Sequence, residues 1–118
     1  MTEKRNQTRR VARGKYDLFD INSGEYLGIL VNMTTEGMML MSRTPIPPDF
    51  VFQLEMRMSR PFRGTASVTF GAEALWCMRS TGNGHYWTGF RIIDIADETE
   101  GFLAEMIASW KPETRSAA

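Results

Sequence analysis

Short apolar segments separated by turn residues dominate the first 95 residues of the chain. Six segments read as strands, at residues 16–21, 26–31, 38–41, 50–57, 62–78 and 85–93. The clearest period-two alternation is found at Phe50, Phe52, Leu54 and Met56, as expected for one face of a strand. Closely spaced short strands joined by turns predict an all-β fold, an antiparallel barrel or sandwich of six or seven strands.

Two turns and one bend are predicted within this pattern. Ser59-Arg60-Pro61 is expected to reverse the chain, and Gly82-Asn83-Gly84 is expected to form a hairpin turn. Gly71 can provide a bend or bulge in the long segment 62–78. Every second residue in the later part of that segment is apolar, which predicts a single buried face made of Val68, Phe70, Ala72, Ala74, Trp76 and Met78.

Only the end of the chain has helical periodicity. A helix is predicted over residues 97–111, with Asp97 and Glu100 in a capping-box-like start and Pro112 as a stop. Its apolar face consists of Phe102, Leu103, Met106, Ile107 and Trp110. We expect this face to pack against the barrel, and a dimer or partner surface is the less favoured alternative. Residues 112–118 are then a tail.

Composition restricts the class of protein. A chain of 118 residues with 42% hydrophobic residues suits one folded domain. No run of about 18 uncharged apolar residues is present, so membrane insertion is not expected. The polar N-terminus has no apolar stretch typical of a signal peptide, so none is expected. The single Cys77 excludes an internal disulfide, and a cytoplasmic protein is expected.

Catalytic and metal-binding motifs are scarce. The sequence has neither a P-loop nor a glycine-rich dinucleotide motif, and His85 is its only histidine. A Cys77–His85 dyad is conceivable, but Cys77 lies in an apolar strand context where a buried, inert thiol is the commoner case. The sequence therefore predicts a protein that is not an enzyme and holds no metal or cofactor.

Charge is balanced overall, with 14 basic and 14 acidic residues, but it is unevenly distributed. Residues 1–15 contain six basic side chains against Glu3, and we predict a flexible basic arm over residues 1–14 that precedes a barrel over residues 15–96. Such an arm is either a solvated tail or an anion site. Its arginines stand four apart twice, as Arg5 with Arg9 and as Arg9 with Arg13.

Together with the corner Asn32-Met33-Thr34-Thr35-Glu36-Gly37, this arm resembles the signature of the PilZ family. PilZ domains are bacterial receptors for cyclic di-GMP, and their signature is Arg-x-x-x-Arg followed by Asp/Asn-x-Ser-x-x-Gly. Here Thr34 replaces the serine, which keeps the hydroxyl and adds a methyl group. The resemblance extends to Trp76, an aromatic on a late strand, and loosely to Gly89-Phe90. It implies a six-stranded PilZ-like barrel.

The resemblance also implies a ligand site. Guanidinium groups bind phosphate oxygens and the guanine edge through paired hydrogen bonds, which suits a cyclic dinucleotide. The spacing to Asn32 favours Arg5 and Arg9 as the signature pair, with Arg10 and Arg13 as auxiliary phosphate contacts or barrel-edge charges. Asn32 and Thr34 would contact guanine edges or an arginine, Gly37 would allow close backbone approach or positive φ, and Trp76 would supply a stacking surface.

The leading hypothesis is a cyclic di-GMP receptor whose arm becomes ordered on the ligand and signals to an unidentified protein partner. By family resemblance that partner would control motility, exopolysaccharide or virulence. The alternative is a drifted PilZ-like interaction module that does not bind cyclic di-GMP. A small barrel that binds single-stranded nucleic acid is disfavoured, because the net charge is zero and the basic residues lie in one tail. Monomer and homodimer both remain open.

Overall fold

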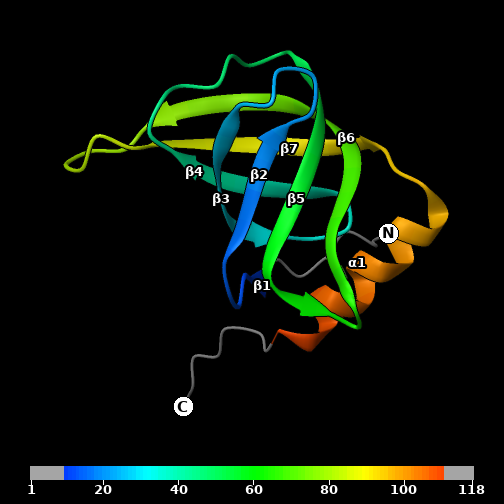
Figure 1. Cartoon of the computed structure of the whole chain (residues 1–118). Coiled ribbons are helices and arrows are strands. Elements are labelled where there is room, and N and C mark those ends of the chain that lie inside the picture. The colour runs from blue at the N-terminus through cyan, green and yellow to red at the C-terminus, as the bar shows by residue number, and fades with distance from the viewer. Residues whose placement is uncertain (1–9, 111–118) are drawn as a thin grey trace, which may run out of the picture.

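The computed structural model describes residues 10–110, whose strands form one antiparallel sheet that closes on itself (Figure 1). The elements are β1 (Arg10–Val11), β2 (Tyr16–Asp20), β3 (Tyr26–Met33), β4 (Gly37–Ser42), β5 (Val51–Phe62), β6 (Thr65–Arg79), β7 (Tyr86–Asp94) and α1 (Asp97–Ser109). The strand order is β1-β3-β2-β5-β6-β7-β4, and pairing of β3 with β4 closes a barrel of six strands. Strand β1 is added to β3. The predicted barrel with a C-terminal helix is confirmed.

The core fills the barrel with aliphatic and methionine side chains. Leu54 and Met56 are fully buried, as their alternation predicts, whereas Phe50 at the start of the same pattern is 58% exposed. The largest fully buried side chains are Leu18, Met33, Met38, Leu40, Leu54, Met56, Thr88, Leu103 and Met106. Most of these come from strands, and Leu103 and Met106 come from α1.

The turn predicted at Ser59-Arg60-Pro61 is wrong, and the hairpin turn at residues 82–84 is confirmed. Strand β5 runs on to Phe62, and the chain reverses at Arg63 and Gly64, which have φ values of 50° and 81°. The pairing of β5 with β6 is interrupted between Arg57 and Phe62. Pro61 lies in this interruption, where the lack of a backbone N–H costs no hydrogen bond between the strands. Gly82 and Gly84 both have positive φ, as the hairpin turn requires.

Strand β6 does not keep one face buried along its whole length. Phe70, Ala72 and Ala74 point into the core, but Trp76 and Met78 are 41% and 59% exposed. Register shifts in the pairing with β7 fall between Gly71 and Ala72 and between Ala74 and Trp76. The expected irregularity at Gly71 is present. The second irregularity, between Ala74 and Trp76, turns the side chains that follow it from the core towards solvent. Trp76 therefore lies on the outer surface of the barrel.

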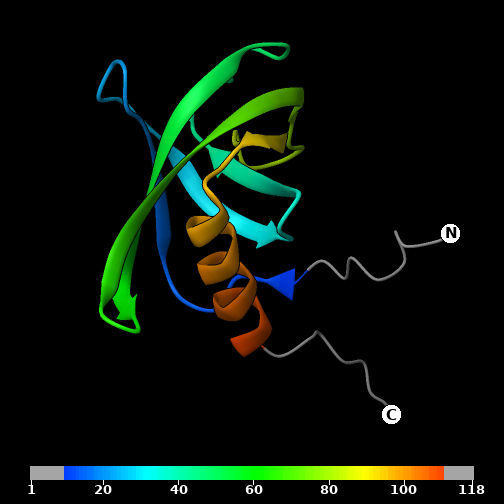
Figure 2. The ribbon, with the colours of Figure 1, turned by 90° about the vertical axis from the view of Figure 1, so that its right-hand side faces the viewer.

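Helix α1 lies across one opening of the barrel (Figure 2). Its apolar face is in the core, with Leu103, Met106 and Trp110 at most 2% exposed, so the expected packing against the barrel is confirmed. The capping box is wrong: the N-cap is Ala96, without a side-chain hydrogen bond, and Asp97 lies in the acidic first turn. The helix ends at Ser109 because Trp110 is extended. Within residues 10–110 no helix is long and apolar enough to cross a membrane.

Candidate ligand-binding site

The corner between β3 and β4 is held by Thr34. Its Oγ1 accepts hydrogen bonds from the backbone N–H groups of Glu36 at 3.0 Å and Gly37 at 3.1 Å. The Thr34 N–H donates to the Gly37 carbonyl at 2.8 Å, and Thr34 is only 8% exposed. A hydroxyl that closes a tight turn in this way explains the local spacing of the Asn-x-Thr-x-x-Gly segment. Gly37 does not take the positive φ offered as one of its roles.

Strand β1, at the end of the predicted arm, lies alongside this corner. Arg10 pairs with Met33 and Val11 pairs with Asn32, and the Ala12 N–H donates to the Val31 carbonyl at 2.9 Å. The segment predicted as the arm thus ends as a short strand on the edge of β3. Arg5 and Arg9, the predicted signature pair, lie outside the described residues.

Trp76 rests directly on the backbone of Gly89. A Cβ atom at Gly89 would lie 2.4 Å from Trp76 Cε2 and 2.5 Å from Nε1, so only glycine allows this approach. The ring borders a shallow pocket of about 150 Å³ on the barrel surface, lined by Asn32, Met38, Met39, Leu75, Trp76, Gly89 and Phe90. We call this the Asn32–Trp76 pocket. It joins two of the predicted site residues from distant parts of the sequence.

The arginines Arg10 and Arg13 have surroundings of a different kind. Arg10 donates from Nη1 to the backbone carbonyl of Trp110 at 2.7 Å, which ties β1 to the end of α1. Arg13 lines a larger cavity near the same end of the helix, together with Lys15 and Arg60. Neither arginine lines the Asn32–Trp76 pocket. Their role as auxiliary phosphate contacts or as barrel-edge charges stays a prediction.

Several residues of the Asn32–Trp76 pocket are absent from the sequence-based site. Met39 and Leu75 line it, and Gly89 forms its base. Gly89 itself is the one signal in the sequence that points to this pocket. A glycine in a strand otherwise rich in large side chains marks a place where another group approaches the backbone closely. The partner of that approach, Trp76, cannot be deduced from sequence spacing because the two residues meet across β6 and β7.

No protein-family model and no curated protein sequence matches this chain, whereas solved structures do. The Bacillus subtilis inhibitor of motility, MotI, superposes with a TM-score of 0.71 at 11% identity over 92% of this chain and 51% of its own. The PilZ domain of Escherichia coli YcgR, determined with c-di-GMP, gives 0.67 at 18% identity over 92% of both chains. The PilZ domain of CeSA from a cellulose-synthesizing bacterium gives 0.57 at 13% identity, over 86% of this chain and 95% of its own.

These likenesses define the class of the protein by its fold. The chain spans about half of MotI but nearly all of the isolated YcgR domain. At these identities the agreement concerns backbone architecture, and it shows that the chain has the PilZ fold. The resemblance drawn from the arginine arm and the Asn32–Gly37 corner is therefore confirmed at the level of the fold.

Proposed function

We propose that this protein is a bacterial cyclic di-GMP receptor that binds its ligand on the outer face of the barrel. The observation that carries the proposal is the Asn32–Trp76 pocket, in which a signature residue and an exposed aromatic ring adjoin. Asn32 pairs with Val11 of β1, through which the arginine-bearing arm joins the barrel. The PilZ domain of YcgR, which has the same fold, was determined with c-di-GMP.

The size of the pocket argues for participation of the arm. Pockets for drug-sized ligands generally enclose about 300 to 1,000 Å³, and a cyclic dinucleotide is at least of that size. The Asn32–Trp76 pocket has about 150 Å³, enough for one base but not for the whole ligand. The arm, with Arg5 and Arg9, supplies the remaining contacts. Binding therefore changes the surface that residues 1–9 and β1 present.

Each group has a chemical role in this arrangement. The Trp76 ring provides a π-face on which a guanine stacks, and Gly89 sets the depth of the ring. The Asn32 amide offers both a donor and an acceptor for a guanine edge or an arginine. The guanidinium groups of Arg5 and Arg9 bind phosphate oxygens or guanine O6 and N7. Thr34 shapes the corner through its hydroxyl oxygen and keeps its O–H proton for donation.

The rearranged arm then engages a protein partner in the cytoplasm, and the protein itself performs no chemistry. Ligand energy used to order a segment is a standard switching device. Control of motility, exopolysaccharide or virulence is the output in keeping with this class, and the MotI structure of the same fold is that of an inhibitor of motility.

A second candidate function is a protein-interaction module that does not bind cyclic di-GMP. Thr34 favours it, because the residue is 8% exposed and its oxygen already accepts two backbone N–H groups. A side chain committed to its own turn has less to offer a ligand. The two functions differ in whether cyclic di-GMP binds at all.

The site is tested by comparing Asn32→Ala with Asn22→Ala in titrations with cyclic di-GMP. Asn22 is an exposed asparagine in the turn between β2 and β3 and serves as the matched control. We expect Asn32→Ala to weaken binding about tenfold through loss of amide contacts to a guanine or arginine, and Asn22→Ala to bind like the unchanged protein. Equal affinities for both variants would place the ligand elsewhere, and no binding by the unchanged protein would favour the interaction module.

A further inference from the structure

A second cavity lies at the end of the barrel that α1 closes. It has a volume of about 560 Å³, and its walls come from the β1–β2 connection, the end of β5 and the end of α1. The lining residues are Arg13, Gly14, Lys15, Tyr16, Ser59, Arg60, Pro61, Phe62, Ser109 and Trp110. We call it the Arg13–Arg60 cavity. It shares no residue with the Asn32–Trp76 pocket.

The β1–β2 connection forms this cavity through an excursion of the chain. Strands β1 and β2 pair with successive parts of β3, and residues 13–15 bulge out between them. Gly14 has a φ of +119°, and its position lies over the Tyr16 ring, where a Cβ would be 3.5 Å from Cε1. The Lys15 carbonyl accepts a hydrogen bond from the Ser59 N–H at 3.1 Å, which fixes the excursion beside the end of β5.

The floor of the cavity is a packed aromatic pair. Tyr16 and Trp110 meet edge to face with ring centroids 5.3 Å apart, and the indole Nε1–H donates to the Tyr16 hydroxyl at 3.1 Å. The same hydroxyl donates to the Arg13 carbonyl at 3.1 Å. Both rings are largely buried, at 7% and 2% exposure. A floor held by packing and by two hydrogen bonds resists collapse of the cavity.

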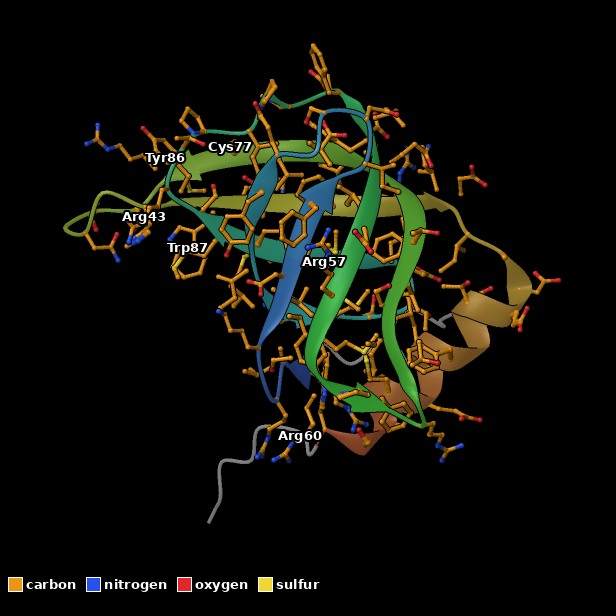
Figure 3. The ribbon with its side chains drawn as sticks, in the orientation of Figure 1. Arg43, Arg57, Arg60, Cys77, Tyr86 and Trp87 are labelled. Carbon is orange, nitrogen blue, oxygen red and sulfur yellow. The ribbon has the colours of Figure 1, made fainter. Side chains whose placement is uncertain are left out.

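The cavity carries an uncompensated positive charge. Three cations line it, Arg13, Lys15 and Arg60, and the only acidic side chain within 4 Å of any of them in the described chain is Asp17, 3.9 Å from Lys15. The guanidinium groups of Arg13 and Arg60 have neither an ion pair nor a hydrogen bond among residues 10–110. By contrast, Arg57, Arg63 and Arg91 are each paired with a glutamate. Figure 3 shows Arg60 at the far end of β5, well separated from Arg57.

We propose that the Arg13–Arg60 cavity binds a small molecule that carries phosphate groups. Guanidinium groups bind phosphate oxygens through paired hydrogen bonds, and two of them with a lysine suit a multiply charged anion. The volume lies within the range of about 300 to 1,000 Å³ typical of small-molecule sites. Arg13, Lys15 and Arg60, which are distant in the sequence from Trp110, thus line one anion site beside it.

A structural role for these cations is the competing explanation. The last turn of α1 contains no basic residue, so nearby arginines could balance its negative carbonyl end. Arg10 already fills that role by donating to the Trp110 carbonyl, whereas Arg13 and Arg60 donate to no carbonyl of the described chain. The two explanations predict different results on substitution, because a purely structural charge affects stability and leaves anion binding unchanged.

The test follows the three indole N–H signals by NMR while pyrophosphate is added at low ionic strength. Trp110 forms the floor of the cavity, and Trp76 reports on the other pocket. We expect a saturable shift of the Trp110 signal and no shift of Trp76. Arg13→Ala and Arg60→Ala should each weaken binding about tenfold through loss of a charge-assisted hydrogen bond. Arg43→Ala, which removes an equal charge on a side of the barrel well away from Arg60, should leave it unchanged (Figure 3).

A parallel titration with GDP separates the possible sources of the phosphate. Equal affinity for GDP and pyrophosphate identifies the phosphate groups as the recognised chemistry, and tighter binding of GDP identifies a nucleotide. The proposal is overturned if Trp110 shows no saturable shift with either probe. It is equally overturned if Arg43→Ala weakens binding as much as Arg60→Ala, or if Arg60→Ala lowers the melting temperature with no effect on binding.

Discussion

Replacing Gly89 with alanine tests the candidate cyclic di-GMP site through a single methyl group. The new Cβ would lie 2.4 to 2.6 Å from three atoms of the Trp76 indole, far inside van der Waals contact. The ring must therefore move, and at 41% exposure it has room to swing towards solvent. The substitution thus displaces the proposed stacking surface without removing any side chain from the site.

The expected magnitudes separate binding from stability. Stacking of a base on an aromatic side chain contributes about 1 to 3 kcal/mol, so losing it should weaken cyclic di-GMP binding by about tenfold or more. Moving an exposed ring costs about 1 kcal/mol of folding stability. Alanine in place of glycine in a strand regains about 0.5 to 1 kcal/mol of backbone entropy. The melting temperature should therefore change little while the affinity falls.

Gly101→Ala is the matched control, because nothing lies within 4 Å of its added Cβ and the residue is in the middle of α1. It should stabilise the protein by about 0.5 to 1 kcal/mol and leave binding unchanged. Calorimetric titration and thermal melts of both variants provide the comparison. If Gly89→Ala binds cyclic di-GMP as tightly as the unchanged protein, Trp76 does not form the stacking wall and the reasoning fails.

Two further predictions concern stability. Arg10→Ala removes the partly buried hydrogen bond to the Trp110 carbonyl and should cost about 1 kcal/mol, a fall of about 4 °C in melting temperature, whereas the exposed Arg43→Ala should melt like the unchanged protein. Burial, and then a hydrogen bond to Asp17, raises the pKa of Tyr26 above 10.0, so the folded state holds the phenol proton more tightly than the unfolded state. Its contribution to stability is complete below pH 10 and is lost as the pH rises through the raised pKa, and Tyr26→Phe should remove this part of the alkaline dependence in urea melts.

Local patterns in the sequence predict the strands and the helix well. The alternation around Leu54 and Met56 and the stripe of Leu103, Met106 and Trp110 are direct consequences of burial on one face. Pro61 predicts a turn that is not there, because it occupies an interruption in the pairing of β5 with β6. Such an interruption depends on a partner strand and leaves no mark in local sequence.

The candidate sites are less accessible to sequence analysis, because they depend on contacts between distant residues. The PilZ signature points to Asn32, and Trp76 stands out as an aromatic on a late strand. The outward orientation of Trp76, however, results from a bulge opposite Gly89. The Arg13–Arg60 cavity combines three segments whose proximity is set by the closure of the barrel and the docking of α1. No spacing in the sequence connects these segments.

The measurement that tests the central proposal most directly is calorimetric titration of the full chain with cyclic di-GMP, with GTP as control and Arg9→Ala as the comparison. The account predicts saturable binding of micromolar affinity or tighter, no comparable binding of GTP, and loss of binding in Arg9→Ala at an unchanged melting temperature. No binding of cyclic di-GMP by the unchanged protein, or unaltered binding by Arg9→Ala, would contradict it.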